Sequence, residues 1–442
     1  MADPHTSASN ENKSTVGGGG EEKKDASPAG VCLQSRSSLV LPRPQRIYKV
    51  PPLLLADKEH VYHPRVLSLG PYHHGQPQFP RVEEFKTDIL NRFVSADKDK
   101  AFFCNKILER IDRIRSYYEE GSTAKFNDEA LAEMMLRDAC FMLCHMEVKS
   151  DREYLPLGMS VTSFLYQDFY MLENQIPLWI LRLLIGLKYG TNGKAALFSK
   201  LLSCMKLRDN GQTRIPWKDA NEPPHLLAAL RKILLFGPGQ HVTELRSSSE
   251  SMYKIASSSQ FRSVMDLKAK GVHFRPSSSC LMDIRFHSNS FYGLLHLPIW
   301  YISNNTKVIF SNMIAYEMSA ETATNCGVLS SVSFMKTLIE NAKDVKELRE
   351  KGILFSCLES DEEVVKVFKE INTFGMDYLS TFGDVKMRIE EYCSSKAKTW
   401  MADLINTYFR SPLPLIALVV GALLLCLEII QVHYAIHPVK DN

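Results

Sequence analysis

The sequence lacks the short motifs that mark common catalytic and nucleotide-binding sites. It has no GxSxG nucleophile elbow, no GxxxxGK[ST] phosphate loop, no GxGxxG turn after a strand, no HExxH zinc motif and no protein-kinase signature. Each of these motifs places a defined chemical group at a fixed spacing, so none of these reactions is indicated. We therefore favour a non-enzymatic function without a cofactor.

The sequence also lacks a large excess of either positive or negative charge. The chain of 442 residues carries 53 Lys and Arg against 50 Asp and Glu, a formal net charge of +3. No basic stripe with interleaved aromatic residues is present, although that is the pattern that nucleic-acid binding requires. The sequence therefore predicts no nucleic-acid partner.

Cysteine pairs and a secretory leader are missing as well. The ten cysteines are scattered without a CxxC, which fits a reducing compartment better than a disulfide scaffold. The first thirty residues contain no apolar core of the kind a secretory signal needs. Both observations favour a cytosolic position for the bulk of the chain.

One long apolar segment lies near the C-terminal end. Leu413–Leu427 reads LPLIALVVGALLLCL, and the extended segment Leu413–Ile436 covers the ~20 residues that a helix needs to cross a membrane. The sequence predicts a transmembrane helix over 411–436 and a short tail over 437–442. Tail anchoring, with lipid contact through this helix, follows, and the endoplasmic reticulum is a possible location.

Three residues qualify this predicted helix. Glu428 falls nearer its far end than its centre, where a carboxylate can reach the headgroups or can pair with a partner helix. Tyr434 suits an interfacial aromatic position. Gly421 is the single glycine of the segment, so no GxxxG pattern supports helix pairing.

The rest of the chain divides by composition. Residues 1–44 are predicted to be disordered, because they are rich in Ser, Gly, Glu and Lys. Residues 45–245 form a helical first half, and the Ser-rich segment 246–260 is a loop or linker. Residues 261–410 combine a small β-element with helices. The predicted fold is thus predominantly α, with a small β-meander or hairpin in the second half and a C-terminal transmembrane helix.

Periodicity and capping residues place the individual elements. Helices are predicted over Val82–Val94, Ala101–Tyr118, Asn127–Met146, Thr162–Leu187 with a break near Pro177, and Asp361–Phe374 with Ser360 as its cap. Strands are predicted over Val272–Phe274, Leu281–Phe286, Leu294–Ile302 and Thr306–Phe310.

Histidines cluster in one segment of the first half. Imidazoles this close together are candidate zinc ligands, although their spacing matches no standard zinc site. The alternative, which we favour, is that GPYHHG forms a turn whose imidazoles hydrogen-bond to neighbouring carbonyls. The candidate ligands are His60, His63, His73 and His74, and the turn residues are Gly70, Pro71, Tyr72 and Gly75.

Two carboxylates have strongly apolar neighbours in the sequence. Asp138 lies in MMLRDACFML and Asp168 in FLYQDFYML, with Glu173 five residues further on. A carboxylate pair in a cleft could perform general acid–base catalysis. A buried structural network, with Arg137 or Arg182 as partner, is the favoured alternative.

Cysteine chemistry is a weaker candidate. Cys140 and Cys144 are four residues apart and share one helix face, but Cys144 and His145 are adjacent and point in different directions. A nucleophilic Cys–His pair is therefore disfavoured. Buried cysteines that pack as small hydrophobic residues are expected.

Several ordered blocks resemble one known family. They are IYKVP (47–51), LSLGPYHHG (67–75), EMMLRDACFML (133–143), DFYMLENQIP (168–177) with Asn174, Gln175 and Pro177 intact, and LIENAKDVKELREKGIL (338–354). The chain is identified as a member of the plant family called "domain of unknown function 247". The resemblance implies a mostly helical, membrane-anchored plant protein without established catalysis, and it favours the plasma membrane as its location. Some grass relatives are linked to self-incompatibility.

Together these observations favour a membrane-anchored recognition or signalling scaffold with a protein partner. The alternative is a hydrolase or transferase that uses the buried carboxylates or the histidine cluster.

Overall fold

The computed structural model describes residues 46–55, 59–147, 157–190, 222–235, 262–277, 280–289, 291–319, 326–375, 381–394 and 412–436. The predicted disordered tail and the predicted Ser-rich linker, 246–260, lie outside these ranges. The predicted domain boundaries therefore stay predictions.

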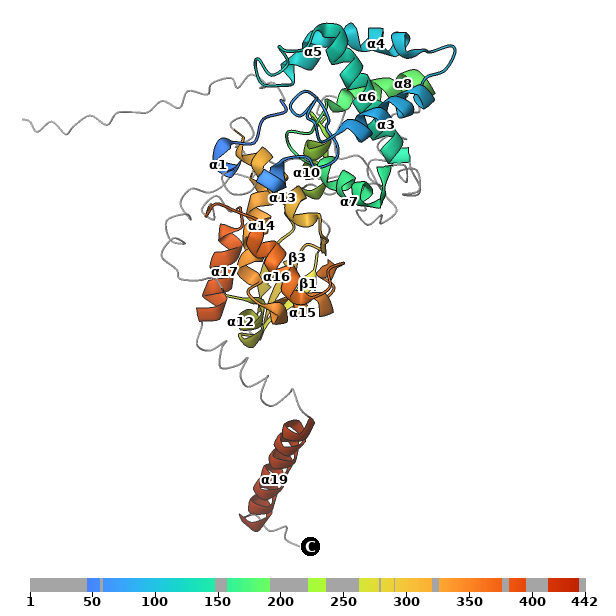
Figure 1. Cartoon of the computed structure of the whole chain (residues 1–442). Coiled ribbons are helices and arrows are strands. Elements are labelled where there is room, and N and C mark those ends of the chain that lie inside the picture. The colour runs from blue at the N-terminus through green and yellow to red at the C-terminus, as the bar shows by residue number, and fades with distance from the viewer. Residues whose placement is uncertain are drawn as a thin grey trace, which may run out of the picture. The chain divides into compact units, whose positions relative to one another are not determined.

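Helices make up the described part of the first half (Figure 1). They are α1 (Pro52–Leu55), α2 (Glu59–Tyr62), α3 (Pro80–Phe93), α4 (Lys100–Leu108), α5 (Ile111–Ser116), α6 (Asp128–Glu147), α7 (Met159–Asp168), α8 (Leu178–Tyr189) and α10 (Leu226–Leu235). Helix α6 packs against α3, α4 and α8 and is the centre of this group. It begins where the sequence predicts, because the Asn127 side chain accepts a hydrogen bond from the backbone N–H of Ala130.

The second half contains five short strands and six helices among the described residues. The strands are β1 (Val272–Pro276), β2 (Arg285–Ser288), β3 (Gly293–Leu297), β4 (Trp300–Ile302) and β5 (Leu354–Ser356). The helices are α12 (Val264–Ala269), α13 (Thr306–Met318), α14 (Gly327–Leu338), α15 (Ala342–Glu350), α16 (Asp361–Glu370) and α17 (Gly383–Ser394). One further helix, α19 (Pro412–Ile436), follows near the C-terminal end.

The three-stranded sheet has the order β1-β3-β2. Strand β3 pairs antiparallel with β2, as a hairpin does, but it pairs parallel with β1. The predicted hairpin is therefore present, whereas the predicted simple meander is not. Strands β4 and β5 form a separate parallel pair.

One predicted strand is a helix. Thr306–Phe310 begins α13, whose first turn is fixed by a hydrogen bond from the backbone N–H of Ser303 to the Thr306 hydroxyl, 2.8 Å. Helix α13 is buried on nearly all sides. A helix of that kind shows no polar face in its sequence, so an apolar run of this length reads equally well as a strand.

The expectation of a membrane-spanning helix is corrected. Among the residues that the structure describes, no helix is both long enough and apolar enough to cross a membrane.

The conclusions that rested on that span are withdrawn with it. These are the single-pass topology, the lipid contact of the C-terminal helix, and the assignment to the plasma membrane or endoplasmic reticulum. Of the residues assigned to the span, Gly421, Leu427 and Glu428 are exposed on α19. The side chains of Leu413 and Tyr434 lie outside the described set.

Candidate functional site

The loop formed by residues 65–70 surrounds the carboxylate of Asp168. The backbone N–H groups of Val66 and Leu67 each donate to one Asp168 oxygen at 2.8 Å, and the N–H of Arg65 lies 3.1 Å from both oxygens. Asp168 ends α7 and is fully buried. Burial raises its pKa to about 6, and the three amides act in the opposite direction. Asp168 therefore satisfies three backbone donors, one of which belongs to the fully buried Leu67.

Two more side chains bind the same 65–70 loop. Asn174 accepts from the N–H of Leu69 at 2.6 Å and donates to the carbonyl of Leu67 at 2.9 Å. Asp138, on α6, accepts from the N–H of Gly70 at 2.8 Å. Three side chains from two segments thus hold five of the loop's backbone N–H groups.

Lys86, on α3, completes this buried network. Its ammonium lies 2.7 Å from Asp138 and 2.6 Å from Glu83, and it also donates to the carbonyl of Ser68. Lys86 and Asp138 are both almost fully buried. Burial raises the pKa of Asp138, whereas the Lys86 charge lowers it. Of the two predicted partners, Arg137 lies 3.9 Å from Glu83 and Arg182 lies 3.0 Å from Glu222.

Gly70 is required where the 65–70 loop turns. Its φ of +70° lies in the left-handed region, and an added Cβ would lie 2.7 Å from the carbonyl oxygen of Gln175 and 3.0 Å from the Tyr118 hydroxyl. Gln175 is fixed in turn, because its amide donates to the carbonyls of Phe169 and Met171 at 2.8 and 2.7 Å. The GPYHHG turn, residues 70–75, therefore packs directly against the ENQIP block, residues 173–177.

The remaining residues of these two blocks also have structural contacts. Tyr72 donates to the carbonyl of Ile47 at 2.7 Å, and Pro71 is buried. Pro177 is buried and precedes α8 as its N-cap residue. Gly75 has a φ of +82° and is exposed at the end of the turn.

The four candidate histidines do not converge on one point. His73 lies 3.3 Å from Glu173 and 3.2 Å from the Gln76 amide, and its ring meets the ring of His63 edge-on at 5.5 Å. His74 packs on Phe126. His60 is exposed on α2. Within the described part of the chain, no group of three or more His, Cys, Asp or Glu residues is arranged to hold a metal ion.

Glu173 is less buried than Asp138 and Asp168. Burial raises its pKa, but the contact with His73 and the N–H of Val50, 2.8 Å away, outweigh burial and leave the pKa below its ordinary value. A carboxylate with a lowered pKa is a poor general base near neutral pH. The pair of Glu173 and His73 therefore fits a structural contact better than proton transfer.

The cysteine pair also shows no activation. Burial raises the pKa of the Cys140 thiol, the direction opposite to that of a nucleophile. The ring of His145 stacks on Phe169 at 4.3 Å. This part of α6 is packed as hydrophobic core.

A second buried polar cluster joins α10, α13 and α14, and sequence reasoning missed it. Glu317, fully buried on α13, lies 2.7 Å from Arg231 and accepts from the N–H groups of Val328 and Leu329 at 2.9 Å each. Such a carboxylate neutralises the positive end of α14. The sequence shows a single Glu in an apolar run, which gives no indication of its partners.

His225 lies beside this cluster and should make stability depend on pH. It is fully buried, its Nδ1 accepts from the N–H of Ala228 at 3.3 Å, and its Nε2 has no hydrogen-bond partner among the described residues. Burial lowers its pKa to about 3. Below pH ~6.5, His225 therefore binds a proton in the unfolded chain but remains neutral in the folded chain until the pH nears its lowered pKa.

We expect this group to stabilise the fold fully above pH ~6.5 and progressively less as the pH falls toward its folded pKa. Between pH ~6.5 and ~5 the loss is about 2 kcal/mol, or ~1.4 kcal/mol per pH unit. His225→Asn keeps a capping acceptor but cannot be protonated, so its unfolding free energy should fall less over this range. Urea titrations at several pH values measure the difference, and parallel curves for the two proteins would contradict the assignment.

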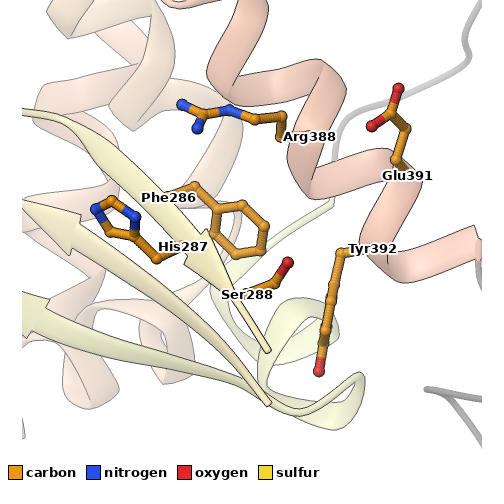
Figure 2. A pocket seen from close by; sticks show the side chains of 6 residues that line it. All are labelled: Phe286, His287, Ser288, Arg388, Glu391 and Tyr392. Carbon is orange, nitrogen blue, oxygen red and sulfur yellow. The ribbon is translucent and has the colours of Figure 1, made fainter. Parts of the chain in front are cut away.

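One pocket of about 400 Å³ lies between β2 and α17. Figure 2 shows its lining residues from the strand and from the helix, which are Phe286, His287, Ser288, Arg388, Glu391 and Tyr392. The rings of Phe286 and Tyr392 meet edge-on, with their centroids 5.8 Å apart. No candidate residue from the sequence analysis lies here, because a pocket formed by a strand edge and a distant helix leaves no motif.

Comparison with known proteins gives a family. The model of the family described as "Plant protein of unknown function", domain of unknown function 247, matches residues 47–427. The chain is 26% identical over 402 residues to UPF0481 protein At3g47200 of Arabidopsis thaliana, covering 83% of this chain and 81% of that protein. It is 23% identical over 479 residues to Putative UPF0481 protein At3g02645 of the same plant, covering 87% and 89%.

No solved structure matches the chain. The family match extends from the Ile47–Tyr118 β-bridge through the 65–70 loop and the sheet to α19. Because it covers most of the chain, this protein belongs to the plant family called domain of unknown function 247.

Proposed function

We propose that this protein is a non-catalytic recognition module that binds a protein partner. The observation that carries the proposal is the use of Asp168, a carboxylate whose pKa burial raises to about 6. In the part of the chain that the structure describes, the hydrogen bonds of its carboxylate are with three backbone N–H groups of the 65–70 loop, and the side chain is fully buried. A general acid must reach a substrate, and this one cannot do so without unfolding the loop.

The neighbouring polar groups support the same proposal. Asp138 forms an ion pair with Lys86 and accepts from the N–H of Gly70. The amide oxygen and the amide nitrogen of Asn174 both hydrogen-bond to the backbone of the 65–70 loop. Residues that are buried and fully hydrogen-bonded rigidify a core and give it a single conformation. A rigid core of this kind suits a protein that presents a fixed surface to a partner.

Co-purification tests the proposal. The full chain, tagged and expressed in plant tissue, is isolated after mild crosslinking, and the mass and composition of the native complex are measured. We expect one partner protein in near-stoichiometric amount. Repeated recovery of the chain alone would overturn the proposal.

A substrate survey tests the alternative of a hydrolase or transferase. Wild type and Asp168→Asn are compared on a broad panel of ester, glycoside, phosphate and acyl-transfer substrates. Turnover by the wild type that Asp168→Asn abolishes, in a variant that still has its native circular dichroism, would establish an enzyme and displace the recognition proposal.

A further inference from the structure

The outer face of the three-stranded sheet carries two rows of cationic and imidazole side chains. In register across the sheet, Arg275 of β1 lies beside His296 of β3, which lies beside Arg285 of β2. The next row is His273, Leu294 and His287. The inner face carries the buried residues of the same strands. We call these two rows the cationic sheet face.

The positive charge of the cationic sheet face is poorly neutralised from within the molecule. Arg275 is exposed and has no ion pair or hydrogen bond among the described residues. Arg285 has one carboxylate partner, Asp283, at 2.8 Å. The Nδ1 atom of His296, between the two arginines, is buried and has no hydrogen-bond partner in the described structure.

Like charges on adjacent strands destabilise a sheet. The described contacts within the molecule offset little of this repulsion. An arginine guanidinium suits carboxylate and phosphate groups, because its N–H groups can donate to two oxygens at once. With neighbouring strands ~4.8 Å apart, the two arginines project from backbones about 10 Å apart. That separation fits anionic groups on alternating positions of an extended peptide better than one small ion.

Aromatic side chains border the same face. Tyr292 is 43% exposed and Phe291 is 58% exposed in the turn between β2 and β3, and the Tyr292 ring meets the His273 ring edge-on at 5.5 Å. Exposed aromatic residues beside arginines are the side chains that contribute most to protein–protein interfaces. They favour a peptide over an isolated inorganic anion.

We propose that the cationic sheet face binds an acidic segment of a partner protein, with carboxylates of the segment paired to Arg275, His296 and Arg285. This inference rests on the proposed recognition function and specifies the surface and the chemistry of the partner. In this proposal, the buried network around the 65–70 loop stabilises the fold and does not contact the partner.

Binding of this kind should depend on pH. The pKa of His296 is lowered by burial and by Arg285, His287 and Arg275, with Asp283 opposing them. The pKa of His273 is lowered by burial and by Lys351, Arg275 and Lys268, with Glu347 opposing them. Both imidazoles are therefore mainly neutral near pH 7. Because an acidic peptide stabilises their protonated forms, binding takes up protons, and affinity rises as the pH falls.

Fluorescence anisotropy on the full chain tests the proposal. The probes are a short labelled peptide rich in Glu, the same peptide with Gln at every Glu, and a single-stranded RNA of similar charge, each at about pH 7.5 and about pH 5.5. The test variant is Arg275→Gln/Arg285→Gln. The control variant, Arg81→Gln/Lys369→Gln, removes the same charge from exposed positions on α3 and α16.

We expect the Glu peptide to bind the wild type more tightly at the lower pH and the test variant about tenfold more weakly, with the control variant unchanged. The Gln peptide should not bind. Absence of wild-type binding, equal weakening by both variants, or preference for RNA over the Glu peptide would each overturn the proposal.

The two proposals fail in different ways. If the partner recovered by co-purification binds the test variant as well as it binds the wild type, the cationic sheet face is wrong and recognition stands. If no partner is recovered and no peptide binds, both proposals fail.

Discussion

Replacing Asp168 with alanine should lower the free energy of unfolding by about 3–5 kcal/mol. The substitution removes the acceptor of the backbone N–H groups of Arg65, Val66 and Leu67, and both Asp168 and Leu67 are fully buried. Each buried donor left without a partner costs about 1–3 kcal/mol. Urea unfolding near pH 7.5 measures the loss, and hydrogen exchange should show faster exchange across residues 65–70.

Asp168→Asn should fall between the wild type and alanine. An amide retains one acceptor oxygen, but its NH2 group faces donors and cannot accept from them. Asp112→Ala, an exposed acid on α5, is the control and should change stability by no more than about 0.5 kcal/mol. An alanine variant within about 1 kcal/mol of wild type, with unchanged exchange over the 65–70 loop, would show that the loop does not depend on this carboxylate.

The parts of the fold with a clear periodic signal could be predicted from sequence. Helix α3 shows an apolar face at helical spacing. The N-cap residue of α16 is Ser360, as predicted, and its hydroxyl accepts from the N–H of Glu363 at 3.2 Å. These signals are local, because the residues that cause them lie within four positions of one another. Element boundaries set by tertiary contacts were harder: the predicted helix over Ala101–Tyr118 is two helices, α4 and α5.

The candidate site depends on contacts that the sequence does not display. The residues around the 65–70 loop could be selected because a carboxylate in an apolar run needs a partner. The partners themselves could not be identified: Asp168 binds amides about a hundred positions away, and Asp138 binds a lysine 52 positions away. Lysine is a residue normally found at the surface, so nothing in the sequence indicates that Lys86 is buried.

The predicted membrane helix and the cationic sheet face both show where prediction from the sequence fails. The apolar segment 413–436 gave a strong prediction from composition, yet no described helix meets the requirement for a span. The cationic sheet face gave no signal, because Arg275, Arg285 and His296 come from three strands and meet only through register. Alternation along a single strand identifies an outward position but not its neighbours.

Lys86→Met should be the second strongly destabilising substitution, with a loss of about 3–5 kcal/mol. Methionine fills a similar volume but leaves Asp138 as a buried carboxylate without its counter-charge, which is the costly half of a broken ion pair. The carbonyl of Ser68 loses its donor as well. Lys369→Met, on the exposed face of α16, removes an equal charge and should cost no more than about 0.5 kcal/mol.

The double variant Lys86→Met/Asp138→Asn separates lost charge pairing from lost packing. Asparagine is neutral and its carbonyl can still accept from the N–H of Gly70, so the penalty for a buried unpaired charge disappears while the 65–70 loop keeps one of its anchors. The double variant should therefore be more stable than Lys86→Met alone, by about 1–3 kcal/mol, although it carries one substitution more. If it is instead less stable than Lys86→Met, then Lys86 stabilises the protein by packing and by its bond to Ser68, and the ion pair with Asp138 is not what the fold requires.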